Sequence, residues 1–254
     1  MPSDPTIAVC VADRVSVEGL GGVDRISTDT TADVPFGADG GAGDDVLTGG
    51  RGRDELYGRA GRDEIYGGDA NDGVFGGDGE DEVHGGSGDD LLCGDCTPVL
   101  PASGPQPISP GADRIEGGAG IDTVTYLERD ADVTVSLDGK PDDGVAGEND
   151  LVAGDIENVV GGNRNDTLVG DDGPNELDGG SGIDTLAGNG GNDTLHGGVG
   201  RDTLLGGSGD DQLADYRYTE LSHDSAVDTL DGQVDADSCW QGPEDHIRNC
   251  EQGA

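Results

Sequence analysis

Glycine, acidic and aliphatic positions recur along this chain with a period of nine. From Gly40, six consecutive nonapeptides each begin with glycine, carry an aspartate at position 6 and an aliphatic residue at position 8. These six end at Cys93, and a second set of six runs from Gly161 to Ala214. All twelve position-8 residues are Leu, Ile or Val. A shuffled chain would not keep this register through two long stretches, so the period is a structural signal.

Each nonapeptide predicts one turn and one short strand. Positions 1 to 6 are rich in Gly and Asp, which permit positive φ and tight turns. Positions 7 to 9 read as a three-residue strand whose middle side chain points inward. The next turn reverses the chain, so successive strands enter two sheets and two repeats make one coil. The pattern predicts an all-β fold, a right-handed parallel β-roll or β-solenoid of nonapeptide repeats in two blocks with irregular caps.

The register also predicts how the chain is divided. Short strands at Ile7–Ala12 and Val15–Val17 are expected to cap the first end, because an unpaired strand edge is otherwise exposed. The expected segments are an N-terminal cap with degenerate repeats (1–39), a first repeat block (40–93), a Cys- and Pro-rich insertion (94–110), degenerate repeats with linking strands (111–160), a second repeat block (161–214) and a C-terminal cap (215–254).

Composition and charge exclude several classes of protein. Glycine accounts for 50 of the 254 residues, and the formal net charge is −42. This charge repels nucleic acids and anionic lipids, and no apolar run is long enough to span a membrane. Aromatic residues make up 3% of the chain, too little large apolar mass for a conventional close-packed α/β enzyme core.

The position-6 side chains are the candidate metal ligands. Coils of a roll stack at about 4.8 Å, and carboxylates at that spacing repel each other unless a cation lies between them. Carboxylate and carbonyl oxygens are the ligands that Ca²⁺ prefers. The candidates, including one from an additional repeat, are Asp45, Asp54, Asp63, Asp72, Asp81, Asp90, Asp122, Asp166, Asn175, Asp184, Asp193, Asp202 and Asp211.

The repeated motif GGxGxDxUx, in which U is aliphatic, resembles the RTX (hemolysin-type) calcium-binding repeat. Gly117–Thr125 is one further complete unit, and Gly19–Ser27 and Gly111–Glu116 are partial units. The resemblance implies that a turn and the turn two repeats later share one Ca²⁺. A block of six repeats would then hold about four ions.

Calcium is expected to be needed for folding. Burial of the aliphatic column does not offset the entropy of ordering the repeats, and the negative charge adds self-repulsion. We therefore predict a chain that folds when Ca²⁺ binds. Departures from the motif include Arg164 and Ala70 at position 4 and Arg59, Asp171 and Asn189 at position 2. We expect weak or absent metal binding within Gly161–Asp178, where Asn175 also lacks a charge, and a regular first block apart from Ala70.

The five cysteines suggest covalent links. Cys239 and Cys250 are predicted to form a disulfide in the terminal segment, and Cys93 and Cys96 a small one that closes the turn after the first block. A redox-active C-x-x-C site and a zinc site remain alternatives for the second pair. Cys10 is left over, either free or paired with another chain.

Nothing in the sequence indicates a catalytic centre, so we expect no enzymatic activity. The zinc-protease motif H-E-x-x-H and the nucleophile elbow G-x-S-x-G do not occur. His84 and His196 fall at position 9 and are expected to face solvent. Tyr57 and Phe75 should share one outer face and Tyr66 the other. Cross-strand packing is the simple explanation for them, and a carbohydrate-binding face is the alternative.

Ca²⁺ sites of this type fill at extracellular concentrations, and the expected disulfides fit the same compartment. Met1–Ala12 does not have the pattern of a signal peptide. The preferred function is a secreted structural or adhesive calcium-binding roll, whose cell-surface or matrix partner the sequence does not identify. The alternatives are the C-terminal repeat portion of a larger secreted RTX toxin or protease, a carbohydrate-active protein built on the roll, and a disordered acidic calcium buffer.

Overall fold

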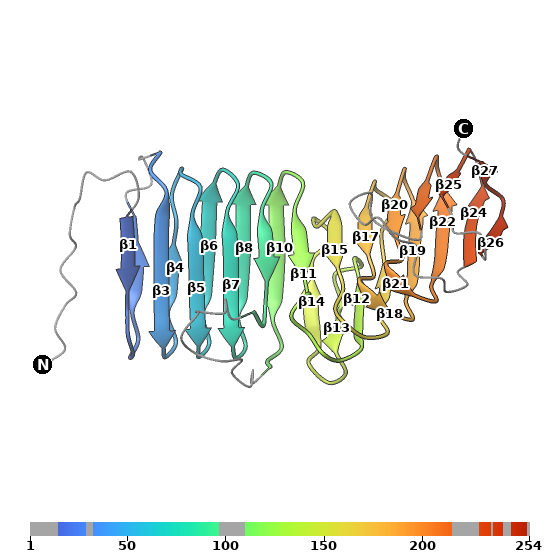
Figure 1. Cartoon of the computed structure of the whole chain (residues 1–254). Helices are drawn as coiled ribbons and strands as arrows, with labels where there is room; N and C mark the ends of the chain where they lie inside the picture. The colour runs from blue at the N-terminus through green and yellow to red at the C-terminus, as the bar shows by residue number, and fades with distance from the viewer. Residues whose placement is uncertain are drawn as a thin grey trace, which may run out of the picture.

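The computed structural model describes residues 15–28, 33–96, 110–214, 229–234, 236–240 and 245–252. All regular secondary structure in these residues is β-strand. The strands form an elongated stack with β1 at one end and β27 at the other (Figure 1). Ile7–Ala12, Cys10 and most of the insertion, on which predictions were made, lie outside the described residues.

Two long sheets run the length of the stack. The first takes the strands of alternate repeats and the second takes those between them, as the sequence predicted. In sheet order, the first contains β1 (Val15–Glu18), β3 (Phe36–Ala42), β5 (Glu55–Ala60), β7 (Gly73–Asp78), β9 (Leu91–Cys93), β11 (Thr123–Thr125), β15 (Asn158–Val160), β17 (Glu176–Asp178), β20 (Thr194–His196), β23 (Gln212–Ala214), β25 (Ser238–Trp240) and β27 (Glu251–Gln252).

The second sheet has thirteen strands, and a pair of short strands lies apart from both sheets. The second sheet contains β2 (Arg25–Ser27), β4 (Val46–Thr48), β6 (Glu64–Asp69), β8 (Glu82–Ser87), β10 (Arg114–Ala119), β14 (Asp150–Val152), β13 (Pro141–Val145), β12 (Val133–Ser136), β16 (Thr167–Val169), β19 (Thr185–Gly190), β22 (Thr203–Ser208), β24 (Thr229–Val234) and β26 (His246–Arg248), and the short pair is β18 (Ser181–Gly182) with β21 (Val199–Gly200).

Strand register confirms that eighteen residues make one coil within the blocks. Leu56 of β5 lies between Ala38 of β3 and Val74 of β7, and all three strands are parallel. In the other sheet, Ile65 of β6 lies beside Val83 of β8 in the same way. Aliphatic residues of equivalent position therefore stack directly on one another, and the predicted parallel β-roll is confirmed.

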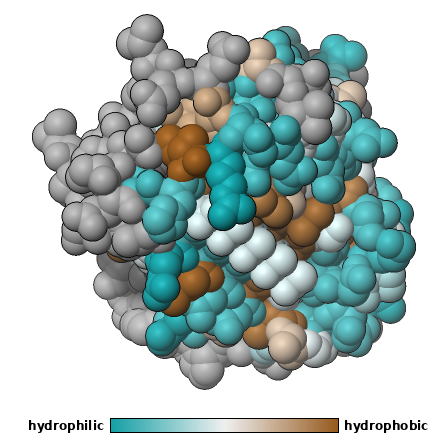
Figure 2. All heavy atoms as spheres, turned by 90° about the vertical axis from the view of Figure 1, so that its right-hand side faces the viewer, coloured by the Kyte–Doolittle hydropathy of each residue, from teal (hydrophilic) through white to brown (hydrophobic). Residues whose placement is uncertain are grey.

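The core is a column of these stacked aliphatic side chains between the two sheets. All twelve position-8 residues are completely buried, with 0% of their surface exposed. The pleat alternates inward and outward residues, so the short strand of each repeat turns its middle residue into the core. Seen from the end that carries β27, hydrophobic atoms are surrounded by hydrophilic ones (Figure 2).

The linking segment does not interrupt the stack. Strands β12, β13 and β14 form antiparallel pairs, the exceptions to the parallel pairing of the sheets. β14 continues the first block by pairing with β10, and β12 begins the second by pairing with β16. The core continues through buried Val135, Val152 and Ile156. No helix among the described residues has the length and apolar character needed to cross a membrane.

The sheets extend beyond Ala214 into the expected C-terminal cap. β24 pairs with β22 so that Leu230 lies beside Leu204, and β25 pairs with β23 so that Cys239 lies beside Leu213. Cys239, with 4% of its surface exposed, takes the place of the position-8 aliphatic residue. The roll thus ends with strands that keep the repeat geometry after the sequence motif has faded.

Candidate metal-binding turns

The turns between strands have the backbone conformation that their glycines permit. Gly68 and Gly86 at position 2 have φ of 121° and 117°, and Gly79 and Gly88 at position 4 have φ of 134°. These values fall in the region that L side chains rarely adopt. A Cβ built on Gly68 or Gly86 would lie against the carbonyl oxygen of the glycine eighteen residues earlier. Successive turns therefore pack backbone against backbone and bring carbonyl oxygens together.

Position-6 aspartates connect each coil to the next through their Oδ1 atoms. The amide of Asp45 donates a hydrogen bond to Oδ1 of Asp63 (2.7 Å), and the amide of Asp63 donates to Oδ1 of Asp81 (2.8 Å). The other sheet repeats this arrangement from Asp54 to Asp72 (2.7 Å). Within each block, stacking at this close spacing makes a ladder of buried side-chain oxygens at both edges of the roll.

The second carboxylate oxygen is what distinguishes these turns. Oδ2 of Asp63 is buried and has no hydrogen-bond partner among the described residues, although a buried carboxylate without a partner is costly. The same holds at both edges of the roll. The described aspartates that share this feature include Asp24, Asp45, Asp63, Asp72, Asp81, Asp90, Asp113, Asp122, Asp184 and Asp193.

These oxygens face a cradle of other oxygens. A Cβ built on Gly40 would meet Oδ2 of Asp45 at 2.5 Å and the carbonyl oxygen of Gly58 at 2.8 Å. A Cβ built on Gly179 would meet Oδ2 of Asp184 and the carbonyl oxygen of Gly197, both at 2.6 Å. Carboxylate and carbonyl oxygens from two adjacent turns thus converge at position 1. This donor set fits Ca²⁺, which takes six to eight oxygen ligands.

The electrostatics also favour a cation. Burial raises the pKa of Asp81 to about 7, and the negative charges of Asp63 and Asp95 add to the rise. Burial likewise raises the pKa of Asp72 and Asp184 to about 7, each with contributions from neighbouring aspartates. A backbone amide lowers the pKa in each case but is outweighed. The folded turns therefore need a positive charge, from protons or from a metal ion, at neutral pH.

Three turns differ from the others. The amide of Gly50 donates to Oδ2 of Asp54 (2.6 Å), that of Gly162 to Oδ2 of Asp166 (2.6 Å), and that of Asp171 to Oδ1 of Asn175 (2.9 Å). The segments stacked before these three turns, which lead into Phe36, Val133 and Asn158, lack the complete turn of the nonapeptide motif. A turn's own amide therefore engages the side-chain oxygen where no complete motif turn precedes it.

The departures from the motif have mixed outcomes. Two of the three deviating turns lie within Gly161–Asp178, where weak metal binding was expected. In the first block we expected only the turn with Ala70 to depart from the regular pattern, but the turn with different hydrogen bonding is that of Asp54. Ala70 instead adopts the left-handed conformation with φ of 80°, as do Arg59 and Asn189 with φ of 85° and 72°. These three residues therefore adopt the conformation of the repeat turn without being glycine, whereas Arg164 and Asp171 do not have positive φ.

The structure adds residues to the ladders that the sequence prediction omitted. The amide of Asp24 donates to Oδ1 of Asp45, and the Oδ1 atoms of Asp113 and Asp237 accept from the amides of the preceding coil. In the linking segment, the carboxylates of Asp150 and Glu157 accept in the same way. Each of them is followed, two residues later in the chain, by a buried inward residue. An acidic residue followed by x-U-x would therefore have identified these ladder residues in the sequence, even where the glycines of the motif are absent.

Both predicted cysteine pairs lie together. Cys93 and Cys96 are disulfide-bonded with Cα atoms 5.7 Å apart, and Cys239 and Cys250 with Cα atoms 5.8 Å apart. The first bridge closes the turn that contains Asp95, and the second joins β25 to the segment between β26 and β27.

The outward aromatic residues pack on one another. Tyr57 stacks on Phe75 with ring centroids 5.1 Å apart on the first sheet, and Tyr66 stacks on His84 at 4.7 Å on the second. This is the cross-strand packing expected for them. The expectation for His196 is wrong, because it is buried along with its sheet neighbours Asp178 and Ala214.

The comparison with known families agrees with the geometry. The model of the RTX calcium-binding nonapeptide repeat (4 copies) matches residues 39–74, 66–95, 109–125, 160–182 and 178–213, just over half of the chain. The chain therefore belongs to the RTX calcium-binding repeat family, and its repeats are calcium-binding repeats. The comparison with curated proteins finds no match.

Proposed function

We propose that this protein is a secreted, non-enzymatic β-roll whose folding is coupled to Ca²⁺ binding, with a structural or adhesive role. The observation that carries this proposal is the buried Oδ2 of position-6 aspartates such as Asp63, Asp81 and Asp184, which has no hydrogen-bond partner among the described residues. Without cations the roll would bury a row of unsatisfied carboxylates, and an unfolded chain would hydrate them instead. Because Ca²⁺ would bind only the folded state, its binding free energy would add to the free energy that stabilises the fold.

The turns support about four ions per block of six repeats. Pairing each turn with the turn two repeats later gives four pairs in the first block, which end at Asp63, Asp72, Asp81 and Asp90. All four of these aspartates have an unpartnered Oδ2. In the second block the corresponding pairs end at Asp184, Asp193, Asp202 and Asp211. The repeats outside the two blocks add pairs that end at Asp45 and Asp122.

Secretion is supported by the chemistry of the turns and by the disulfides. Sites built largely from backbone carbonyls, with few carboxylates each, suit the high Ca²⁺ concentration outside cells. Two disulfide bridges also suit an oxidising compartment. A chain made in a low-calcium, reducing compartment would stay unfolded until it is exported.

A calcium titration monitored by far-UV circular dichroism tests the proposal. Starting in chelator, the full chain should gain β signal cooperatively with Ca²⁺ and not with equal Mg²⁺, because Mg²⁺ demands a tighter octahedral shell. A full β signal already present in chelator at neutral pH would disprove the coupling. A coil signal that persists at several millimolar Ca²⁺ would instead favour a disordered calcium buffer.

A further inference from the structure

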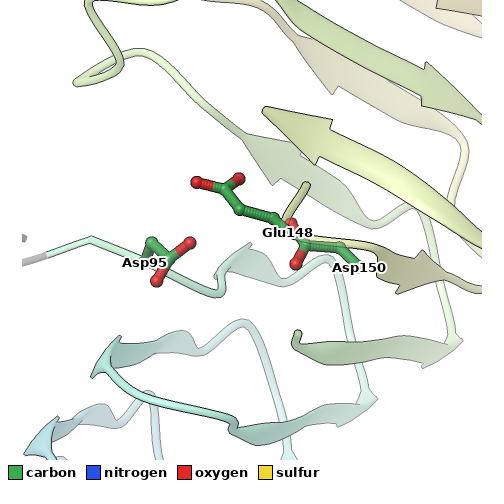
Figure 3. A group of neighbouring side chains, drawn as sticks. All are labelled: Asp95, Glu148 and Asp150. Carbon is green, nitrogen blue, oxygen red and sulfur yellow. The ribbon is translucent and has the colours of Figure 1, made fainter. Parts of the chain in front are cut away.

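A cluster of buried acids lies where the first block meets the linking segment. Asp95 follows β9, Glu148 lies between β13 and β14, and Asp150 begins β14 (Figure 3). One oxygen from each carboxylate lies within 4.8 Å of the others, and all three residues are buried. Asp95 and Glu148 fall outside the nonapeptide positions that carry ligands, so this cluster is distinct from the regular repeat turns.

The cluster replaces a turn that the insertion has disrupted. Gly94 and Asp95 occupy positions 1 and 2 of a repeat whose position 6 is Asp113, with the insertion between them. Asp113 keeps the ladder contact, since it accepts from the amide of Asp81 (2.9 Å) and donates its own amide to Oδ1 of Asp150 (3.1 Å). The insertion thus separates the first two positions of this turn from its position-6 acid, and the carboxylates of Asp95 and Glu148 lie beside the ladder acid Asp150.

A buried oxygen without a partner points into this region. Asp113 has 2% of its surface exposed, and its Oδ2 has no hydrogen-bond partner among the described residues. This oxygen is the atom nearest to a Cβ built on Gly94, the residue directly before Asp95. Oδ2 of Asp113 therefore needs a binding partner beside Asp95, and no protein group in the described part of the chain supplies one.

Arg129 does not neutralise the cluster. Its guanidinium donates to Asp95 (2.9 Å) and to Glu148, while its buried Nε has no acceptor. Tyr126 donates its hydroxyl to Oδ2 of Asp150 (3.1 Å). Four carboxylates, those of Asp95, Asp113, Glu148 and Asp150, face one guanidinium, which leaves three formal negative charges in a buried space. Each carboxylate oxygen that accepts one hydrogen bond retains a lone pair for a metal.

We propose that Asp95, Asp113, Glu148 and Asp150 hold a Ca²⁺ ion at this junction, in a carboxylate-rich site that differs from the repeat turns. The all-oxygen donor set selects a hard cation, and the absence of His and Cys side chains among these four ligands disfavours zinc and copper. The ion would tie the insertion-bearing turn after β9 to β14. It would therefore link the first block to the segment that leads into the second.

Native mass spectrometry of the Ca²⁺-loaded full chain tests this site by counting ions. The double variant Asp95→Asn/Glu148→Gln should bind one Ca²⁺ fewer than the unmodified chain. The control Glu128→Gln/Asp130→Asn makes the same two chemical changes at exposed positions of the same linking segment and should keep the full number. An unchanged count in the Asp95/Glu148 variant would overturn the proposal while the repeat sites remain occupied.

A second measurement does not depend on whether the variant folds. Crystals of the unmodified chain grown with Ca²⁺ should give an anomalous difference peak among Asp95, Asp113, Glu148 and Asp150. Peaks in the repeat turns with none at the junction would overturn this proposal alone. A map without any peak in either place would overturn both this site and the proposed calcium function.

Discussion

The backbone amide of Asp113 donates a hydrogen bond to Oδ1 of Asp150, thirty-seven residues later (3.1 Å). In the regular repeats the same contact spans eighteen residues, as from Asp72 to Asp90 (2.8 Å). The ladder therefore continues across a change in chain spacing, because sheet pairing between β10 and β14 fixes where the acid must lie. The carboxylate ladder follows from the stacking of coils and not from the sequence period alone.

Asp81→Asn should weaken calcium binding. Asn keeps an oxygen that can accept from the amide of Asp63, but it replaces the charged, unpartnered Oδ2 with an NH₂ group. We expect the Ca²⁺ concentration at the midpoint of folding to rise about 10-fold. Circular dichroism titration measures this midpoint. Glu80→Gln, an exposed neighbour with the same loss of charge, should leave it nearly unchanged, and equal shifts in both variants would contradict a specific ligand role.

The metal-free chain should fold better in mild acid. Burial raises the pKa of Asp72, Asp81 and Asp184 to about 7 in the folded state, against about 3.9 when unfolded. Between these values the folded state binds more protons than the unfolded state, so stability falls as pH rises through this window.

In chelator, we therefore expect more β signal at pH 5.5 than at pH 8 by circular dichroism. The Ca²⁺ requirement should show the opposite trend, with a higher midpoint at pH 5.5 because protons compete for the same oxygens. If the metal-free chain lost β signal on acidification within this range, the buried carboxylates would not be what opposes folding.

Ala70→Gly should stabilise the Ca²⁺-loaded protein. Ala70 holds a φ of 80° at position 4, where an L side chain costs about 1 to 2 kcal/mol and glycine does not. We expect a gain of about 1 kcal/mol in the free energy of unfolding, measured with urea in saturating Ca²⁺. Ala42→Gly, at a strand end without positive φ, should instead lose about 0.5 to 1 kcal/mol. A loss in both variants would rule out backbone strain at Ala70.

Removal of the Cys239–Cys250 bridge should destabilise the end of the roll. The bridge closes a loop of eleven residues and ties Cys239, in a core position beside Leu213, to the strands that follow. The chain-entropy relation gives about 3 kcal/mol for this loop and about 2 kcal/mol for the shorter Cys93–Cys96 loop.

Replacement of both cysteines of each pair by alanine, followed by urea unfolding in Ca²⁺, compares the two bridges. Hydrogen exchange should locate the first loss of protection at β25 and β27 in the Cys239/Cys250 variant. A larger loss of stability in the Cys93/Cys96 variant would mean that its bridge acts chiefly by holding Asp95 in place.

The sequence by itself determined the repeat unit, the inward column and the ladder aspartates within the two blocks. Leu56, Ile65 and the other position-8 residues are buried because two nonapeptides make one coil, and contacts of this kind between two repeats of one block join residues eighteen apart. A fixed spacing can be read from a sequence because the geometry repeats wherever the motif does. Both cysteine pairs were also identifiable, since each lies within a short segment.

Tertiary structure decided what happens where the period breaks. Asp113, Asp150 and Glu157 join the ladders through spacings that depend on the lengths of the insertion and of the β12–β14 hairpins. Asp95 meets Glu148 for the same reason, with Arg129 between them. Asp54 differs from Asp72 because of the segment stacked before it, which its own motif does not encode. Such contacts depend on which coil lies next to which, and only the folded stack defines those neighbours.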